Sequence, residues 1–152
     1  MEAPTTDSPL SPEVCEVVAS TAPLLREQGT AITTRFYELL FQRHPHVQAM
    51  FGDRVDQQAV RLAQAVLAYA EHITNPEVLL PVIERIAARH VAAGVEPVQY
   101  PIVGDTLLAA MVDVLGEVDA VVIDAWGAAY DWLANQFVQV ESGLRATAGA
   151  AE

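Results

Sequence analysis

Helix-forming segments, each bounded by its own start and stop signals, make up almost the whole chain, and no stretch alternates apolar and polar residues as a β-strand does. Proline and capping side chains mark the starts, and glycine or His-Pro marks the ends. These signals predict helices over residues 11–28, 30–43, 56–73, 78–93, 96–116 and 120–145, with a short turn at 47–51. The sequence therefore predicts an all-α domain of about six to seven helices packed around a pocket.

The length and the hydrophobic content are those of one folded domain. The chain has 152 residues, of which 52% are hydrophobic, and this is enough to bury a core but too little for two catalytic domains. We expect the domain to span residues 11–146, with flexible tails at 1–10 and 147–152. The helical period predicts that the following side chains face inward: Ile32, Phe36, Leu39, Leu40, Leu62, Ala65, Val66, Tyr69, Val122, Trp126, Ala129, Leu133, Phe137 and Val140.

The charge and the single cysteine indicate which kinds of partner and which cellular compartment to expect. The formal net charge is -12, and all eight basic residues are arginine. Such a surface repels nucleic acids and anionic membranes, so neither is an expected partner. No apolar run is long enough to cross a bilayer, no secretory signal opens the sequence, and Cys15 cannot form an internal disulfide. These features indicate a cytoplasmic protein.

His90 ends an apolar stripe formed by Leu79, Ile83 and Ile86. The steps between these residues are four, three and four, so all the side chains leave the same face of one helix. An imidazole that faces an apolar interior either finds a buried hydrogen-bond partner or coordinates a metal. The stripe alone leaves both interpretations open.

Four segments resemble the globin domain of flavohaemoglobins and the related single-domain bacterial haemoglobins. They are residues 31–41 (AITTRFYELLF), 79–90 (LLPVIERIAARH), 100–104 (YPIVG) and 124–127 (DAWG). The resemblance runs from about Leu10 to Leu144, with the segments in the family's order and at nearly its spacing. It implies a globin fold around a haem. Since the sequence has no Cys-x-x-Cys-His attachment motif, the expected cofactor is non-covalently bound haem b.

Three residues match the proximal side of the family's haem site. His90 matches the ligand of the haem iron, so the resemblance favours coordination by this side chain. Tyr100 and Glu141 match the residues behind that ligand, where a carboxylate accepts the second ring N–H and makes the histidine a stronger electron donor. The sequence alone also allows Glu141 to be a solvated charge. It lies one turn beyond the inward-facing Phe137, however, and so borders the buried stripe.

Four other residues match the distal side, where the family binds gases. By resemblance, Tyr37 and Gln58 donate hydrogen bonds to the bound gas, Phe51 stacks on the porphyrin and Leu62 lies over the iron. The pattern alone also allows plain core packing for the apolar and aromatic residues and a surface position for Gln58. The stretch from Phe51 to Gln58 is a few residues shorter than in most relatives, which leaves Gln57 as an alternative. The helical register favours Gln58, because it continues to Leu62 on the apolar face.

The resemblance implies a haem globin that binds O2 reversibly and converts NO to nitrate, which is nitric oxide dioxygenase activity; CO is a further expected ligand. The fused reductase domain of flavohaemoglobins does not follow Glu141 in this sequence. We therefore expect a separate flavin- or ferredoxin-type reductase to supply electrons. Two alternatives are a non-enzymatic oxygen carrier or buffer with the same pocket, and a haem-free helical interaction module. The expected oligomeric state is a monomer or a homodimer.

Overall fold

The computed structural model describes the backbone of residues 10–151 and the side chains of residues 10–147. All regular elements in this part of the chain are helices, as the sequence predicts. They are α1 (Pro12–Ser20), α2 (Ala22–Arg43), α3 (Pro45–Gln48), α4 (Val55–Glu71), the 3-10 helix η1 (Pro76–Leu79), α5 (Leu80–Ala93), α6 (Gln99–Leu115) and α7 (Ala120–Ala151). Within residues 10–151, none of the helices combines the length and the apolar character that a membrane span requires.

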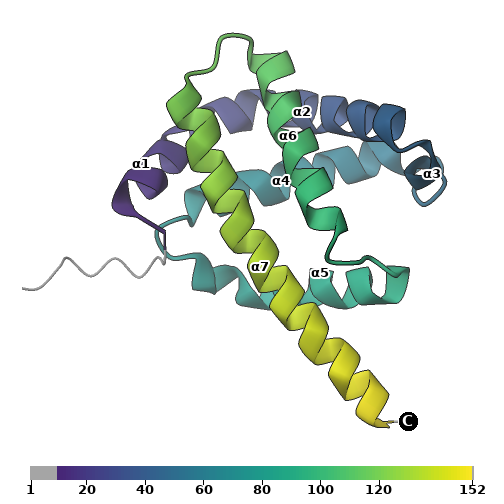
Figure 1. Cartoon of the computed structure of the whole chain (residues 1–152). Coiled ribbons are helices and arrows are strands. Elements are labelled where there is room, and N and C mark those ends of the chain that lie inside the picture. Colours follow the sequence, from purple (N-terminus) through teal and green to yellow (C-terminus); the bar gives the residue numbers. More distant parts are fainter. Residues whose placement is uncertain (1–9, 152) are drawn as a thin grey trace, which may run out of the picture.

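The structure describes only part of the two predicted flexible tails, 1–10 and 147–152, and residues 147–151 of the second tail are helical. Residues 1–9 and residue 152 lie outside the described part of the chain. At the other end, the last helix does not stop near Arg145 as predicted but continues to Ala151. Figure 1 shows this long helix, α7, running diagonally across the molecule, with its final turns extending past α5.

The boundary between the first two helices lies at Thr21, eight residues before the predicted one at Gly29. Pro23 follows in the first turn of α2, where its missing N–H has no helical partner to lose. The buried Thr21 hydroxyl donates to the Val18 carbonyl at 2.6 Å and accepts from Trp126 Nε1 at 3.1 Å. The break is therefore fixed against α7 by side-chain hydrogen bonds, which the local sequence does not reveal.

Gly29 lies inside α2, so the prediction that it ends a helix is wrong. It is buried where α2 packs on α4, and a Cβ at this position would lie 3.5 Å from the Cβ of Ala63. One turn further along α2, the Thr33 hydroxyl donates to the Ala59 carbonyl at 2.6 Å. The small residues on both helices allow this close approach, so the glycine serves the crossing of two helices and not a helix end.

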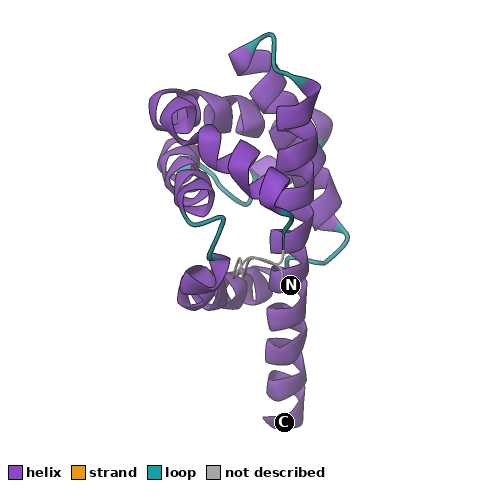
Figure 2. Ribbon diagram, turned by 90° about the vertical axis from the view of Figure 1, so that its left-hand side faces the viewer, coloured by secondary structure: helices purple, strands orange, loops and turns teal. Residues whose placement is uncertain are grey.

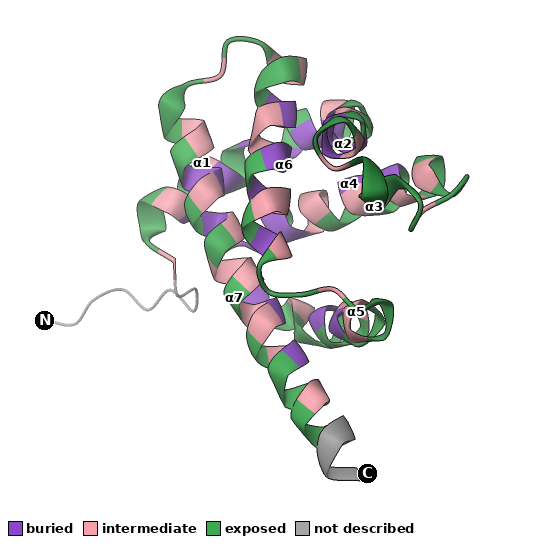
Figure 3. Cartoon of the chain, turned by 45° about the vertical axis from the view of Figure 1, so that its right-hand side comes forward, coloured by how far each residue is buried: buried purple, intermediate pink, exposed green. Residues whose placement is uncertain are grey.

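The buried apolar side chains form two clusters. The larger joins α1, α2, α4, α6 and α7 and includes Ile32, Phe36, Tyr69, Met111 and Trp126. The smaller, between α5, α6 and α7, consists of Ile83, Ala87, Tyr100 and Phe137. Leu79 and Leu133 border both clusters. Figure 3 shows the buried positions of α6 and α7 facing the other helices, while residues 142–147 of α7 are mostly exposed.

One predicted inward position, Ala65, is exposed. The buried face of α4 is centred on Ala59 and Ala63, which pack on α2. Two residues beyond Ala63 the helix has turned by about 200°, so Ala65 points away from that face. The prediction was wrong because it took Leu62 as the centre of the face.

Helix α5 makes its main contacts with α7 and η1, whereas α4 makes its main contacts with α2. Figure 2 shows α5 set apart from α2 and α4 and crossing the long helix α7. The helix that carries His90 is therefore positioned by α7 and by the loops at its two ends.

Candidate functional site

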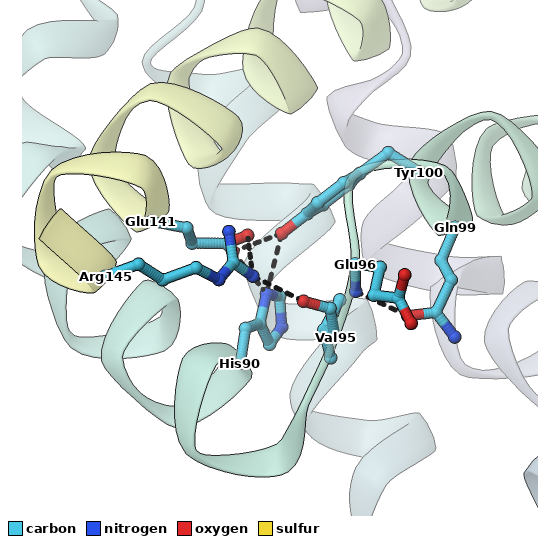
Figure 4. Close-up of polar contacts among 7 residues, drawn as sticks. All are labelled: His90, Val95, Glu96, Gln99, Tyr100, Glu141 and Arg145. Carbon is cyan, nitrogen blue, oxygen red and sulfur yellow. Dashed lines mark hydrogen bonds and ion pairs between the residues drawn. The ribbon is translucent and has the colours of Figure 1, made fainter. Parts of the chain in front are cut away.

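Three helices bring together His90, Tyr100 and Glu141, which we call the triad (Figure 4). His90 lies in the last turn of α5, Tyr100 in the first turn of α6 and Glu141 on α7. His90 Nδ1 is 2.8 Å from Tyr100 Oη and 3.0 Å from Glu141 Oε2. The Tyr100 hydroxyl also donates to Glu141 Oε2. The three proximal residues predicted from the sequence thus form one hydrogen-bonded group.

The chain turn that follows α5 sets the direction of the next helix. Gly94 ends α5 with φ +81°, a left-handed conformation that glycine adopts without strain. The N–H of Val95 then donates to the His90 carbonyl at 2.9 Å, which closes the end of the helix. Gln99 Oε1 accepts from the N–H of Glu96 at 2.7 Å at the start of α6. These bonds hold the short loop that joins the histidine helix to the tyrosine helix.

Glu141 is fully buried, with 0% of its surface exposed. A buried carboxylate is costly unless hydrogen bonds and charges compensate it. Two groups of the triad contact its Oε2, while its Oε1 accepts no hydrogen bond from the described residues. The nearest cation is the Arg145 guanidinium, whose Nη2 is 3.9 Å from Oε1. The carboxylate is therefore compensated on one oxygen far more than on the other.

Burial and the hydrogen bond to Glu141 raise the pKa of the Tyr100 hydroxyl far above its ordinary value. Tyr100 is thus a neutral donor at physiological pH. The carboxylate can accept a second proton donor, which is His90 Nδ1–H. This assignment of the ring proton leaves a lone pair on Nε2, and Nε2 has no hydrogen-bond partner among the described residues.

The second ring nitrogen of His90, Nε2, is suited to bind a metal. The side chain is 31% exposed, and the carboxylate behind it strengthens the donor character of the ring. No group of three or more His, Cys, Asp or Glu side chains that could hold a metal ion occurs in the part of the chain that the structure describes.

The predicted distal residues Tyr37 and Phe51 lie together. Their ring centres are 5.3 Å apart with an edge-on angle of 66°, and Phe41 lies 5.8 Å from both rings. Tyr37 is buried, and burial raises the pKa of its hydroxyl to about 12. The hydroxyl makes no hydrogen bond to a described residue. At neutral pH the hydroxyl is therefore protonated and can act as a hydrogen-bond donor.

The two glutamines at the start of α4 differ in exposure. Gln58 is half-buried and Gln57 is exposed, which is the order that the helical register predicts. Leu62, one turn after Gln58, is half-buried and packs against the larger cluster. The contacts of the described residues do not join the Gln58 side chain to Tyr37.

The sequence analysis did not predict two residues that lie near the triad. Arg145 lies one helical turn after Glu141, a spacing that favours an ion pair, and this signal was available. Tyr130 donates its hydroxyl to the Tyr100 carbonyl at 2.7 Å. Its position thirty residues along the chain gives no local signal of this contact.

Tyr100 also borders a solvent-open hollow of about 310 Å³ between α6 and α7. Tyr130 and Asp131 line it, and His90 does not. Of the triad, Tyr100 lines this hollow, whereas His90 and Glu141 do not.

Comparison with known sequences connects this arrangement to a protein family. The sequence pattern of the globin family matches residues 34–137. A flavohemoprotein of Bordetella parapertussis is 47% identical over 145 residues, which are 93% of this chain and 36% of that protein. A flavohemoprotein of Halalkalibacterium halodurans is 44% identical over 136 residues, which are 87% of this chain and 33% of that protein. The chain thus spans about a third of the length of these curated relatives.

Solved structures resemble the fold over most of its length. A bacterial globin from Campylobacter jejuni has a TM-score of 0.83 and 31% sequence identity, covering 89% of this chain and 99% of that one. An engineered carbene transferase from Rhodothermus marinus, described as a candidate nitric oxide dioxygenase, has a TM-score of 0.85 and 34% identity, covering 92% and 99%. A flavohemoglobin from Malassezia yamatoensis, solved with bound FAD and heme, has a TM-score of 0.80 and 28% identity, covering 90% and 38%. These similarities confirm the fold that the sequence predicts.

Proposed function

Because this chain belongs to the globin family, we propose that residues 11–146 form a haem-binding domain in which His90 is the axial ligand of the iron. The observation that carries this proposal is the state of the imidazole. Its Nδ1 is bonded to Glu141 and Tyr100, and its Nε2 is free. A five-ligand iron site needs one neutral nitrogen at this position and four from the porphyrin, so the donors present fit a haem.

In this proposal the triad controls how strongly His90 donates electrons. Glu141 accepts the Nδ1 proton, which moves electron density toward Nε2. Tyr100 holds the same carboxylate oxygen and so fixes its orientation toward the ring. Both partners are buried, and water is therefore kept from competing for these hydrogen bonds.

The cofactor of the proposal is haem b, bound without a covalent link. When bound, it would supply a ferrous iron at which O2, NO and CO bind and at which NO can be oxidised to nitrate. Phe51 and Leu62 offer apolar surfaces for the porphyrin. Tyr37, whose hydroxyl is protonated at neutral pH, is proposed to donate to a gas ligand, and Gln58 is proposed as a second donor.

We propose nitric oxide dioxygenase activity as the reaction. It is supported by the flavohemoprotein relatives and by the solved structure described as a candidate enzyme of this kind. Turnover requires electrons, and we propose a separate flavin- or ferredoxin-type reductase as their source. The cytoplasmic location and the monomeric or homodimeric state stay predictions.

Absorption spectra of the purified protein in the ferric, ferrous and carbonyl forms test the haem proposal. A Soret band that shifts on reduction and on addition of CO is the expected result. A protein that shows no Soret band after supplementation with haem would be the helical interaction module instead.

Mixing the oxygenated protein with NO tests the reaction. Rapid formation of one nitrate per haem, and repeated turnover once a reductase and NADH are present, would support a dioxygenase. If NO persists beside the oxygenated protein, the oxygen carrier or buffer is the better assignment.

A further inference from the structure

We infer that Arg145 is a positioning residue of the proximal site. Its positive charge makes the Glu141 carboxylate a weaker hydrogen-bond acceptor for the Nδ1 proton of His90. This inference rests on the proposed haem ligation by His90. Arg145 lies one turn after Glu141 on α7, and its Nη2 is 3.9 Å from the carboxylate oxygen Oε1. That oxygen is buried and accepts no hydrogen bond from the described residues.

The guanidinium is held in this place by the loop that follows the histidine helix. Arg145 Nη2 donates to the Val95 carbonyl at 2.6 Å, as Figure 4 shows. The N–H of Val95 in turn donates to the His90 carbonyl at 2.9 Å. The guanidinium is thus hydrogen-bonded to Val95, the residue whose N–H closes the end of the His90 helix. The Arg145 side chain is only 38% exposed. An ordinary surface arginine has no such restraint on its position.

The two oxygens of Glu141 face different partners. Oε2 contacts His90 Nδ1 and Tyr100 Oη, whereas Oε1 faces the arginine. A positive charge on the Oε1 side draws electron density away from Oε2 and makes it a weaker acceptor for the Nδ1 proton. Arg145 therefore limits the electron donation of His90 while Glu141 promotes it. The pair sets an intermediate donor strength.

Substitutions of Arg145 separate its charge from its hydrogen bond. Arg145→Gln keeps an amide donor for the Val95 carbonyl and removes the charge, whereas Arg145→Lys keeps the charge. Arg26→Gln is the matched control, because Arg26 also pairs with a carboxylate, Glu71, at 2.7 Å but is exposed on α2 and does not contact the triad. The two readouts are the iron–histidine stretching frequency of the ferrous protein, by resonance Raman spectroscopy, and the ferric-to-ferrous ratio at a fixed potential.

We expect R145Q to raise the stretching frequency and to increase the ferric-to-ferrous ratio by a factor of about three to ten. R145K and R26Q should stay close to the wild type in both. A purely structural role of Arg145 predicts the opposite sign, because a loosened carboxylate pulls less on Nδ1 and the frequency falls. An unchanged or lowered frequency in R145Q would overturn the inference.

Two further observations keep the outcomes distinct. Far-UV circular dichroism shows whether R145Q folds. If it does not, Arg145→Met removes the same charge, and its iron–histidine stretching frequency decides in the same way. If the wild type itself binds no haem, the proposed function fails and not the role of Arg145. A wild type with a normal haem spectrum and an R145Q protein that matches it would refute the arginine alone.

Discussion

Tyr130 of α7 donates its hydroxyl to the backbone carbonyl of Tyr100 at 2.7 Å, so one helix fixes the turn of another that carries a member of the triad. The ring of Tyr130 lies so close to Gly104 of α6 that a Cβ at this position would be 2.6 Å from it. Side chains do not normally approach each other this closely. Gly104 is therefore required for the crossing of α6 and α7 beside the triad.

Gly104→Ala is expected to lower the free energy of unfolding by about 1–3 kcal/mol, because the new methyl group pushes the Tyr130 ring out of its place. Gly143→Ala is the matched control, since Gly143 also lies in a helix but has nothing within 4 Å of a Cβ. That change should raise the free energy of unfolding by about 0.5–1 kcal/mol through helix propensity. Urea unfolding followed by circular dichroism measures both. A G104A protein as stable as the wild type would show that the ring moves freely.

His90→Ala is expected to abolish stable haem incorporation, because it removes the imidazole that is held by Tyr100 and Glu141 and proposed as the axial ligand. The ratio of Soret to protein absorbance after purification measures the loss. His72→Ala is the control, since His72 is an exposed histidine that follows α4. Retention of a normal five-coordinate ferrous spectrum in H90A would contradict the assignment.

The sequence predicts most of this arrangement where the signal is local. The start and stop signals place the helices, and the spacing of Leu79, Ile83, Ile86 and His90 places the histidine on an inward face. The sequence fails where a distant contact decides. Gly29 ends no helix, because α4 packs against it at Ala63, a contact that local propensity does not contain.

In the candidate site, too, local features can be predicted from the sequence and distant contacts cannot. The position of Glu141, one turn after the buried Phe137, predicts that it borders the core. Its contact with a histidine fifty-one residues away depends on how α5 packs on α7, and for that the family resemblance was needed. Neither source indicated the bond from Arg145 to the Val95 carbonyl, because it depends on the path of a loop.

Exchange of one glutamine at a time tests the distal assignment. Gln58→Val is expected to change the dissociation rate of O2, because the half-buried amide is the proposed second donor. Gln57→Val, on the exposed neighbour, is the matched control and should leave the rate unchanged. Stopped-flow displacement of O2 by CO gives both rates. An effect confined to Q57V would show that the short segment before α4 turns the other amide toward the ligand.

Tyr37→Phe removes a free donor while keeping the ring contact with Phe51. We expect O2 to dissociate faster by a factor on the order of ten to a hundred, which corresponds to about 1.5–3 kcal/mol for a hydrogen bond to a partly charged ligand. Tyr69→Phe is the control, because the Tyr69 hydroxyl donates to the Ala129 carbonyl inside the larger cluster. It should lower stability and leave the dissociation rate unchanged. An unchanged rate in Y37F would show that the hydroxyl points elsewhere.

Alkaline pH is expected to destabilise the protein through its tyrosines. All four have a raised pKa, with burial as the largest cause, and for Tyr37 the pKa is about 12. In the unfolded chain the hydroxyls have the ordinary tyrosine pKa of about 10. As the pH rises above this value, the unfolded state binds fewer protons than the folded state, so the free energy of unfolding falls. Below about pH 9 the tyrosines are protonated in both states, so the free energy of unfolding should not depend on them. Urea unfolding across this range measures the fall, and titration of the phenolate absorbance should show ionisation at lower pH in urea than in buffer. Coincident titration curves for the two states would contradict the burial of these hydroxyls.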